Sequence, residues 1–210
     1  TADLRSAVRK DVRVRVSPSA FMKKIILASS SPQRQSLMQK LGVDFIVEPA
    51  NFDEASVAIG NPQRLARALA LAKAQKVAHH HTNALVIGAD TIVNLGHEIF
   101  GKPRDAKHAR EMLKKLNGRG HTVITGVAIY DTDTHKFLTD AVETKVHFRP
   151  LSDLEIGAYV KSGEPFGKAG GYAIQGLAAF FVEKVEGDYF NVVGLPLERL
   201  AERLKEFGVS

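Results

Sequence analysis

The chain contains no cysteine, and this absence excludes several kinds of chemistry. A disulfide framework, a thiolate zinc site and a thiol nucleophile all require that side chain. The chain also lacks an apolar run close to the ~18 residues that a membrane-spanning helix needs. A reducing cytoplasm is compatible with both absences, and we expect a cytoplasmic protein with no membrane partner.

The loop that follows the first predicted strand carries neither of two common nucleotide-binding signatures. It lacks the Gly-x4-Gly-Lys spacing, so it is not a P-loop, and no Gly-x-Gly-x-x-Gly run appears, so it is not a Rossmann fingerprint. Internal repeats and low-complexity linkers are absent as well. A phosphate site at this loop must therefore be built in another way.

Basic charge is in small excess outside the first 21 residues. The net charge of the chain is +6, of which residues 1–21 carry +3. The remaining surplus is too small to indicate a nucleic-acid partner. Because the head has no apolar signal segment and Met22 resembles a start, we expect residues 1–21 to be a poorly ordered or non-native extension. A basic tether for a membrane or nucleic acid is the alternative. Residues 22–210 are expected to form one domain.

Hydrophobic periodicity predicts alternating strands and helices. Helices are expected at about 32–41, 62–81, 105–116, 152–161 and 196–207. Strands are expected at 25–28, 84–88, 122–130, 144–148, 179–184 and 189–193, with a hairpin over 92–99 and a further apolar strand ending near Gly176. Within the second helix the predicted buried stripe is Leu65, Ala68, Leu69 and Ala72. This order indicates an α/β protein, with a twisted mixed sheet, flanking helices and two lobes around a central cleft.

The first strand leads into a segment suited to an anion. Ser29 and Ser31 follow the strand, and a proline stands where the first helical turn begins. Such a loop gathers backbone N–H groups and a helix N-terminus, and serine hydroxyls add donors. Arg34 adds a planar guanidinium that suits phosphate. A capped helix with a solvated arginine is the alternative interpretation.

Candidate acids and cations lie in the other loops. Asp90 is expected at the end of a buried strand, where it could hold Mg²⁺ or orient water, or cap a turn. Glu54 could ligate a divalent cation or be a solvated loop acid. Lys73, Lys102 and Lys168 could neutralise phosphate charge or lie at the surface.

Five ordered sequence blocks resemble the Maf family of nucleoside triphosphate pyrophosphatases. The resemblance extends from Lys24 to about Phe207, and its blocks are Leu27–Arg34, Gly88–Thr91, Gly101–Arg104, Lys168–Gly176 and Val193–Pro196. The family implies an enzyme with a Maf/ITPase-like fold that cleaves a nucleoside triphosphate into the monophosphate and pyrophosphate. A divalent metal cation, Mg²⁺ or Mn²⁺, is the implied cofactor, and a homodimer is left open.

By position, Asp90 matches the proton acceptor of the family. The positions linked to phosphate or metal contact are Ser29, Ser31, Arg34, Glu54, Lys73 and Lys102, and we assign the metal to Glu54 and Asp90. Asp90 could act as a base or as a ligand, and these roles compete for one carboxylate. Thr91 and Gln175 match the branch that acts on dTTP and UTP, because the 7-methyl-GTP branch has Gln after the Asp.

One position departs from that branch. Gln33 stands where the dTTP/UTP branch usually has an arginine, and this position is linked to substrate choice. We expect dTTP and UTP to remain the best substrates, with the Thr91 hydroxyl and the Gln175 amide pairing with the base edge. A purine-directed pyrophosphatase acting on ITP or 7-methyl-GTP is one alternative. A septum-formation inhibitor that acts by binding a partner is another.

Overall fold

The structure is a computed structural model that describes residues 23–54, 57 and 59–209. The expected extension at residues 1–21 lies outside these residues. A mixed sheet runs through the described part of the chain, with strands in the order β2-β1-β3-β5-β6-β7 and β4 paired to β3. The strands are β1 (Lys24–Leu27), β2 (Ile46–Val47), β3 (Ala84–Leu95), β4 (Glu98–Phe100), β5 (Gly120–Asp131), β6 (Phe137–Phe148) and β7 (Val182–Glu186). The predicted α/β class is confirmed.

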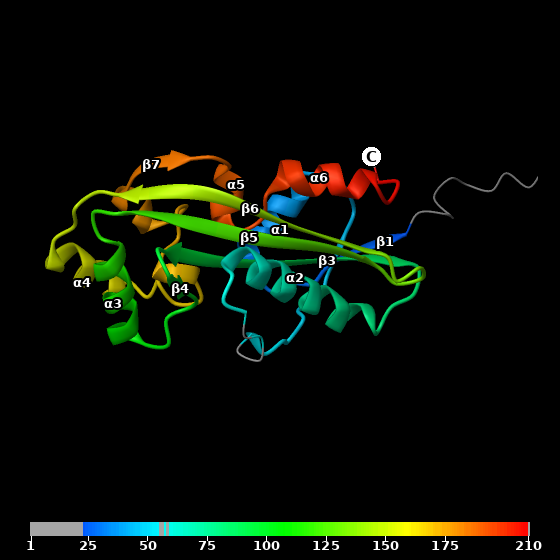
Figure 1. Cartoon of the computed structure of the whole chain (residues 1–210), viewed down its shortest axis with the longest axis horizontal. Coiled ribbons are helices and arrows are strands. Elements are labelled where there is room, and N and C mark those ends of the chain that lie inside the picture. Colours follow the sequence, from blue (N-terminus) through cyan, green and yellow to red (C-terminus); the bar gives the residue numbers. More distant parts are fainter. Residues whose placement is uncertain (1–22, 55–56, 58, 210) are drawn as a thin grey trace, which may run out of the picture.

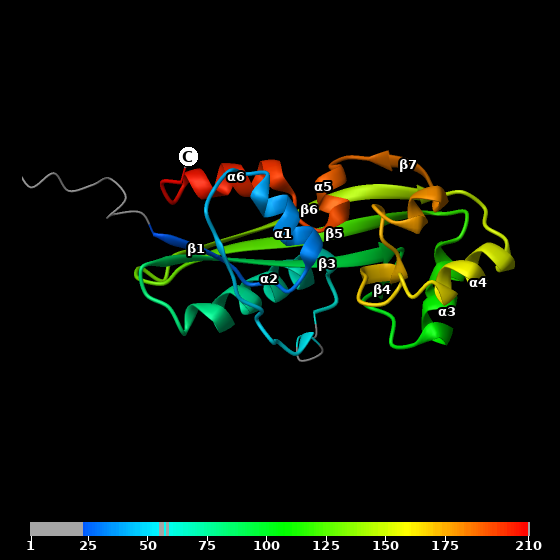
Figure 2. The same cartoon turned by 180° about the vertical axis from the view of Figure 1, so that it is seen from behind.

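Helices cover both faces of this sheet (Figures 1 and 2). One face carries α2, and the other carries α1, α5 and α6, while α3 and α4 lie together near one end. The helices are α1 (Pro32–Gln39), α2 (Pro62–Ala78), α3 (Ala106–Leu116), α4 (Asp153–Lys161), α5 (Tyr189–Val193) and α6 (Leu197–Lys205), with short 3-10 turns η3 (Ala169–Gly171) and η4 (Leu177–Phe181).

The central strand β3 is longer than its sequence indicates. The predicted strand ends at Asp90, but β3 continues to Leu95 and pairs with β5 from Leu85↔Asp131 to Asn94↔Thr122. The β5 partner strand supplies hydrogen bonds to the backbone along this whole stretch, including Asp90 and Thr91. This pairing keeps the strand extended where the sequence suggested a turn. Asp90 therefore lies in the middle of a strand, and its predicted position at a strand end was wrong.

The helix α2 turns a different face to the sheet than its leucines indicate. The buried residues are Ala66, Leu69, Ala70, Lys73, Ala74, Val77 and Ala78, so Leu69 alone is shared with the predicted stripe. The cause is the sheet surface beneath the helix. A Cβ at Gly88 or Gly126 would stand 2.0 Å from the Ala70 carbonyl oxygen or 2.1 Å from that of Ala66. Two glycines and a row of alanines allow this close approach, and it turns Lys73 inward.

Two predicted strands near the C-terminus are not strands. Residues 189–193 form the helix α5 because the Asp188 side chain caps it, accepting from the Phe190 N–H at 2.7 Å. The predicted apolar strand ending near Gly176 is a turn, and η4 occupies much of the strand expected at 179–184, which begins only at Val182. Local bonds, such as Gly176 N–H to Ala173 O at 3.0 Å, replace sheet pairing there.

Candidate active site

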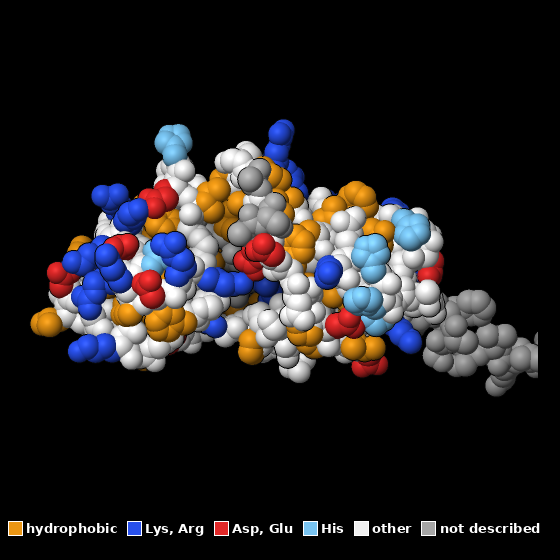
Figure 3. Space-filling view, turned by 90° about the horizontal axis from the view of Figure 1, so that it is seen from below, with side chains coloured by type: hydrophobic (Ala, Val, Ile, Leu, Met, Phe, Trp, Pro, Cys, Tyr) orange, Lys and Arg blue, Asp and Glu red, His pale blue; other side chains and the backbone are white. Residues whose placement is uncertain are grey.

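A cleft of about 780 Å³ brings the candidate residues together. It is lined by the loop at residues 28–31, here called the serine loop, together with the start of α1. The other lining residues come from the segment at 49–54, the middle of β3 and the segments at 163–176 and 192–194. All ten predicted site residues are among the lining residues: Ser29, Ser31, Gln33, Arg34, Glu54, Lys73, Asp90, Thr91, Lys102 and Gln175. Seen from below, the molecule is hollowed between its two halves, and basic side chains reach the hollow beside acidic ones (Figure 3). The predicted cleft is thus present.

The serine loop and the start of α1 form one wall. Ser31 caps α1, because its Oγ accepts from the Arg34 backbone N–H at 3.4 Å and donates to Gln33 Oε1 at 3.2 Å. The Ser29 hydroxyl accepts from the Ser31 N–H at 3.2 Å. The strand, loop and capped helix expected from the sequence are confirmed, and they direct this helix N-terminus at the cleft.

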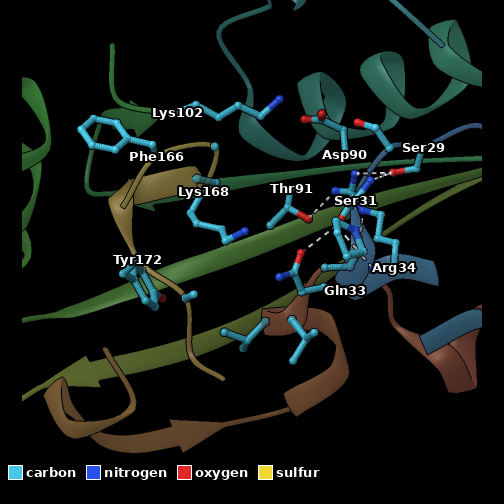
Figure 4. Close-up of a pocket in the computed structure, with 18 of the residues that line it drawn as sticks. Ser29, Ser31, Gln33, Arg34, Asp90, Thr91, Lys102, Phe166, Lys168 and Tyr172 are labelled. Carbon is cyan, nitrogen blue, oxygen red and sulfur yellow. Dashed lines mark hydrogen bonds between the residues drawn. The ribbon is translucent and has the colours of Figure 1, made fainter. Parts of the chain in front are cut away.

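Arg34 is held on the floor of the cleft by its guanidinium (Figure 4). Its Nε donates to the Gly194 carbonyl at 2.8 Å, and Nη2 donates to Thr91 Oγ1 at 3.0 Å. Nη1 lies 3.5 Å from Ser29 Oγ. Burial lowers the pKa of Arg34, while the charges of Asp90 and Glu54 oppose that shift. The guanidinium remains charged even so, because arginine is not deprotonated in proteins.

Asp90 and Lys73 form a buried ion pair beside this arginine. Asp90 is 4% exposed, and its Oδ1 accepts from Lys73 Nζ at 2.5 Å. Burial raises the pKa of the Asp90 carboxyl, and the nearby charges of Lys73 and Arg34 only partly offset that effect. A carboxylate whose proton affinity is raised in this way suits a proton acceptor.

Glu54 joins the two lysines of the cleft. Its Oε1 accepts from Lys73 Nζ and from Lys102 Nζ, each at 2.8 Å. Partial burial favours the neutral acid, but the hydrogen bonds from Lys102 and Lys73 outweigh it and lower the pKa of Glu54 to about 2. Glu54 is therefore ionised near neutral pH and occupies donors that a phosphate oxygen could use.

The opposite wall comes from the glycine-rich segment. Lys168, Phe166 and Tyr172 project from it in Figure 4, and Gln175 stands exposed in the turn that precedes η4. Glu164 fixes this turn, because its carboxylate accepts from the Leu177 N–H at 2.9 Å and from the Tyr159 hydroxyl at 3.0 Å. Sequence reasoning missed Glu164, whose partner lies 13 residues away in a turn taken for a strand.

Two further polar residues that sequence reasoning missed lie beneath the floor. Thr125 on β5 and Asn191 on α5 are both 0% exposed, and they connect to Thr91 through hydrogen bonds. Threonine is common in strands, and the segment containing Asn191 was itself taken for a strand. A polar Asn within an apolar run was the one available signal.

Among residues 23–54, 57 and 59–209, no group of three or more His, Cys, Asp or Glu side chains is placed to hold a metal ion. Over the same residues, no helix combines the length and the apolar character needed to cross a bilayer.

Comparison with known proteins gives a family. The family model described as "Maf-like protein" matches residues 24–207. A protein of Dictyoglomus turgidum named dTTP/UTP pyrophosphatase is 49% identical over 189 residues, covering 90% of this chain and 98% of its own. A Thermoanaerobacter pseudethanolicus protein of the same name is 50% identical over 188 residues, covering 89% and 98%.

A solved structure of the Staphylococcus aureus Ham1 protein is a distant match. It has a TM-score of 0.43 and 16% identity, and it covers 60% of this chain and 72% of its own, so it does not bear on function. The family model, by contrast, matches nearly the whole chain, and the predicted resemblance is confirmed: the chain belongs to the Maf-like family.

Proposed function

We propose that this protein hydrolyses dTTP and UTP to the nucleoside monophosphate and pyrophosphate, with water attacking the α-phosphorus. The observation that carries the proposal is the meeting of Arg34, Lys73 and Lys102 with the buried carboxylate of Asp90 in one cleft. Relatives that share about half of their residues with this chain, over about nine-tenths of its length, carry that activity in their names. A purine preference and a partner-binding role are left as outcomes of the test.

The cations are assigned to the triphosphate. Arg34 offers a planar edge to phosphate oxygens, and Lys73 and Lys102 offer compact charges. Negative charge grows on the pyrophosphate as it leaves, and fixed cations in a partly dry cleft stabilise that charge. Because Glu54 Oε1 already accepts from both lysines, triphosphate oxygens would compete with it for the same donors.

Asp90 is assigned to the attacking water. Lys73 binds Oδ1, so we assign Oδ2 to hold the water and accept its proton as the bond to phosphorus forms. The raised pKa of Asp90 suits that task, because a stronger base takes the proton more readily. The Lys73 ammonium keeps the carboxylate oriented while this happens.

A divalent cation fits the two carboxylates of the cleft. Mg²⁺ favours one or two carboxylates completed by water and substrate phosphates, and Glu54 and Asp90 supply such oxygens around a shared lysine. When bound there, the ion would neutralise phosphate charge and polarise the phosphoryl oxygens. We therefore propose Glu54 as its protein ligand, with Asp90 as a second ligand only in competition with its role as proton acceptor.

Base choice is assigned to the far wall and to the start of α1. Gln175 is exposed at the cleft and carries both a donor and an acceptor for a base edge. Gln33 Oε1 accepts a hydrogen bond from Ser31 Oγ at 3.2 Å. Its neutral amide makes weaker hydrogen bonds to the substrate than a cationic side chain at this position would make. We expect a pyrimidine preference that is real but weaker than an arginine at this position would give.

A substrate panel tests the proposal. The purified full chain with Mg²⁺ or Mn²⁺ is given dTTP, UTP, ITP or 7-methyl-GTP, and pyrophosphate release is measured. We expect dTTP and UTP to be cleaved fastest. Reaction in ¹⁸O-labelled water should place the label in the monophosphate, as attack at the α-phosphorus requires.

Three results would contradict it in different ways. Faster cleavage of ITP or 7-methyl-GTP would move the substrate to the purines. Label in the pyrophosphate would move the attack to another phosphorus. No hydrolysis of any nucleotide by a folded chain would favour the partner-binding role.

A further inference from the structure

The Arg34 guanidinium takes part in a closed ring of hydrogen bonds with Thr91, Thr125, Asn191 and Gly194. Thr91 Oγ1 accepts from Arg34 Nη2 at 3.0 Å and lies 2.9 Å from Thr125 Oγ1. The Thr125 hydroxyl donates to the Asn191 carbonyl at 2.9 Å, and the Gly194 N–H donates to the same carbonyl at 3.1 Å. The Gly194 carbonyl accepts from Arg34 Nε at 2.8 Å, which closes the ring.

One assignment of the hydroxyl hydrogens satisfies every contact in this ring. A carbonyl only accepts, so the single hydroxyl hydrogen of Thr125 must point at Asn191. The contact between Thr91 and Thr125 then requires a hydrogen from Thr91, since the hydrogen of Thr125 is already used. The Thr91 oxygen is left to accept from the guanidinium, which only donates. In this arrangement the hydroxyl hydrogen of Thr91 is used within the ring.

Asn191 secures the ring from below. It is fully buried, and its Nδ2 donates to the Val123 carbonyl at 3.1 Å and to Thr144 Oγ1 at 3.0 Å. These bonds fasten α5 to two neighbouring strands. Gly194 ends that helix with φ +122°, and a Cβ there would lie 3.4 Å from Thr91 Oγ1. The backbone thus reaches Arg34 at a position that favours glycine.

The ring leaves one edge of the guanidinium facing the cleft. Gly194 and Thr91 take the Nε–Nη2 edge, while the Nη1–Nη2 end lies toward Ser29. A planar guanidinium held along one edge can present the other to two phosphate oxygens without losing rotational freedom on binding.

We propose that Thr125 and Asn191 are positioning residues for Arg34, and that Thr91 influences the reaction through Arg34 and not by touching the base. This proposal rests on the proposed function only for its kinetic consequence, because the orientation of Arg34 is measured without substrate.

The first test observes Arg34 directly. In the ¹⁵N spectrum of the full chain, the Arg34 Nε–H should give a sharp signal that is protected from solvent exchange. Thr125→Val keeps the shape of the side chain and removes the hydroxyl, so this protection should fall by at least about tenfold. Thr125→Ser should restore it. Thr132→Val is the matched control. Thr132 is also buried, its hydroxyl donates to the Ala84 carbonyl of β3, and it lies just after the end of β5 that is far from Arg34.

The second test uses a double-mutant cycle in kcat/KM for dTTP. Thr125→Val alone should lower kcat/KM by about tenfold, whereas in an Arg34→Ala background it should have no further effect. A merely structural role would lower kcat/KM by the same factor in both backgrounds. Thr91→Val should behave like Thr125→Val and leave the ratio of dTTP to UTP turnover unchanged.

The outcomes separate this proposal from the proposed function. An Arg34 signal that is unchanged in Thr125→Val, or weakened equally in Thr132→Val, overturns the positioning role whatever the activity. If Thr125→Val does not fold, Thr91→Val breaks the same ring at a partly exposed position and its Arg34 signal decides. A lost signal in an enzyme that ignores dTTP and UTP supports the positioning role and contradicts the proposed function.

Discussion

Asp90 shows how one residue acquires its chemistry from its neighbours. The chain places this carboxylate within a buried strand, and burial raises its pKa, whereas Lys73 and Arg34 keep a negative charge tolerable there. Neither lysine nor arginine is close to Asp90 in sequence. Their convergence comes from α2 packing over β3 and from α1 following β1.

Replacing Asp90 by Asn should remove most of the activity. Asn keeps the size and hydrogen bonding of the side chain but cannot accept the proton of the attacking water, so kcat should fall at least ~10²-fold. Burial raises the pKa of Asp90 in the metal-free chain, and a cation bound at the same carboxylate would lower it, so the acid limb of the wild-type kcat/KM profile should move to lower pH as the Mg²⁺ concentration rises. Steady-state kinetics and a melting curve check this. Near-normal turnover in a folded variant would remove Asp90 from the mechanism.

A second prediction at this scale concerns Gln33. Its amide makes neutral hydrogen bonds, worth about 0.5–1.5 kcal/mol each, against about 1.5–3 kcal/mol for bonds to a charged group. Gln33→Arg should therefore sharpen the preference for dTTP and UTP over ITP by roughly tenfold in kcat/KM. Gln35→Arg, two residues further along the same helix, controls for the added charge. An equal effect from both variants would show that charge alone is responsible.

At the scale of the elements, local motifs were more predictable than buried contacts. The serine loop was predicted, and the helices expected at 105–116 and 152–161 begin where the Asp105 and Ser152 side chains cap them. Each of these motifs depends on residues within four positions of one another. The inward face of α2 could not be predicted from its own periodicity, since it is set by Gly88 and Gly126 on other elements. Asn191 was assigned to a strand because its apolar and aromatic neighbours favour strands.

The close packing of α2 gives a prediction for Gly126. An alanine Cβ there would meet the Ala66 carbonyl oxygen at 2.1 Å, and this is backbone that cannot rotate away. Overpacking of this kind costs about 1–3 kcal/mol, so Gly126→Ala should lower Tm by roughly 2–12 °C. It should also lower kcat, because lifting α2 moves Lys73 from Asp90. Gly60→Ala is the control, since its Cβ meets nothing within 4 Å. An unchanged Tm in Gly126→Ala would contradict the packing argument.

At the scale of the whole molecule, the cleft joins parts that are distant in sequence. Its lining comes from four separate stretches of the chain, residues 28–34, 49–54, 163–176 and 192–194. Cations predominate at its centre, and they pair with two carboxylates. A triphosphate that bridges these walls binds only the folded chain, so ligand binding is coupled to global stability.

That coupling predicts a thermal shift. With the non-hydrolysable α,β-imido analogue of dUTP at 100 times its Kd, the folded state gains about 2.7 kcal/mol, which for a chain of this size raises Tm by roughly 5–11 °C. At the same analogue concentration the shift should be much smaller in Arg34→Ala and Lys102→Ala. Lys102 is 54% exposed, and losing its contact with Glu54 should change the ligand-free Tm little. Lys107→Ala, on the exposed face of α3, controls for the loss of one positive charge. Equal shifts in all four proteins would place the triphosphate outside this cleft.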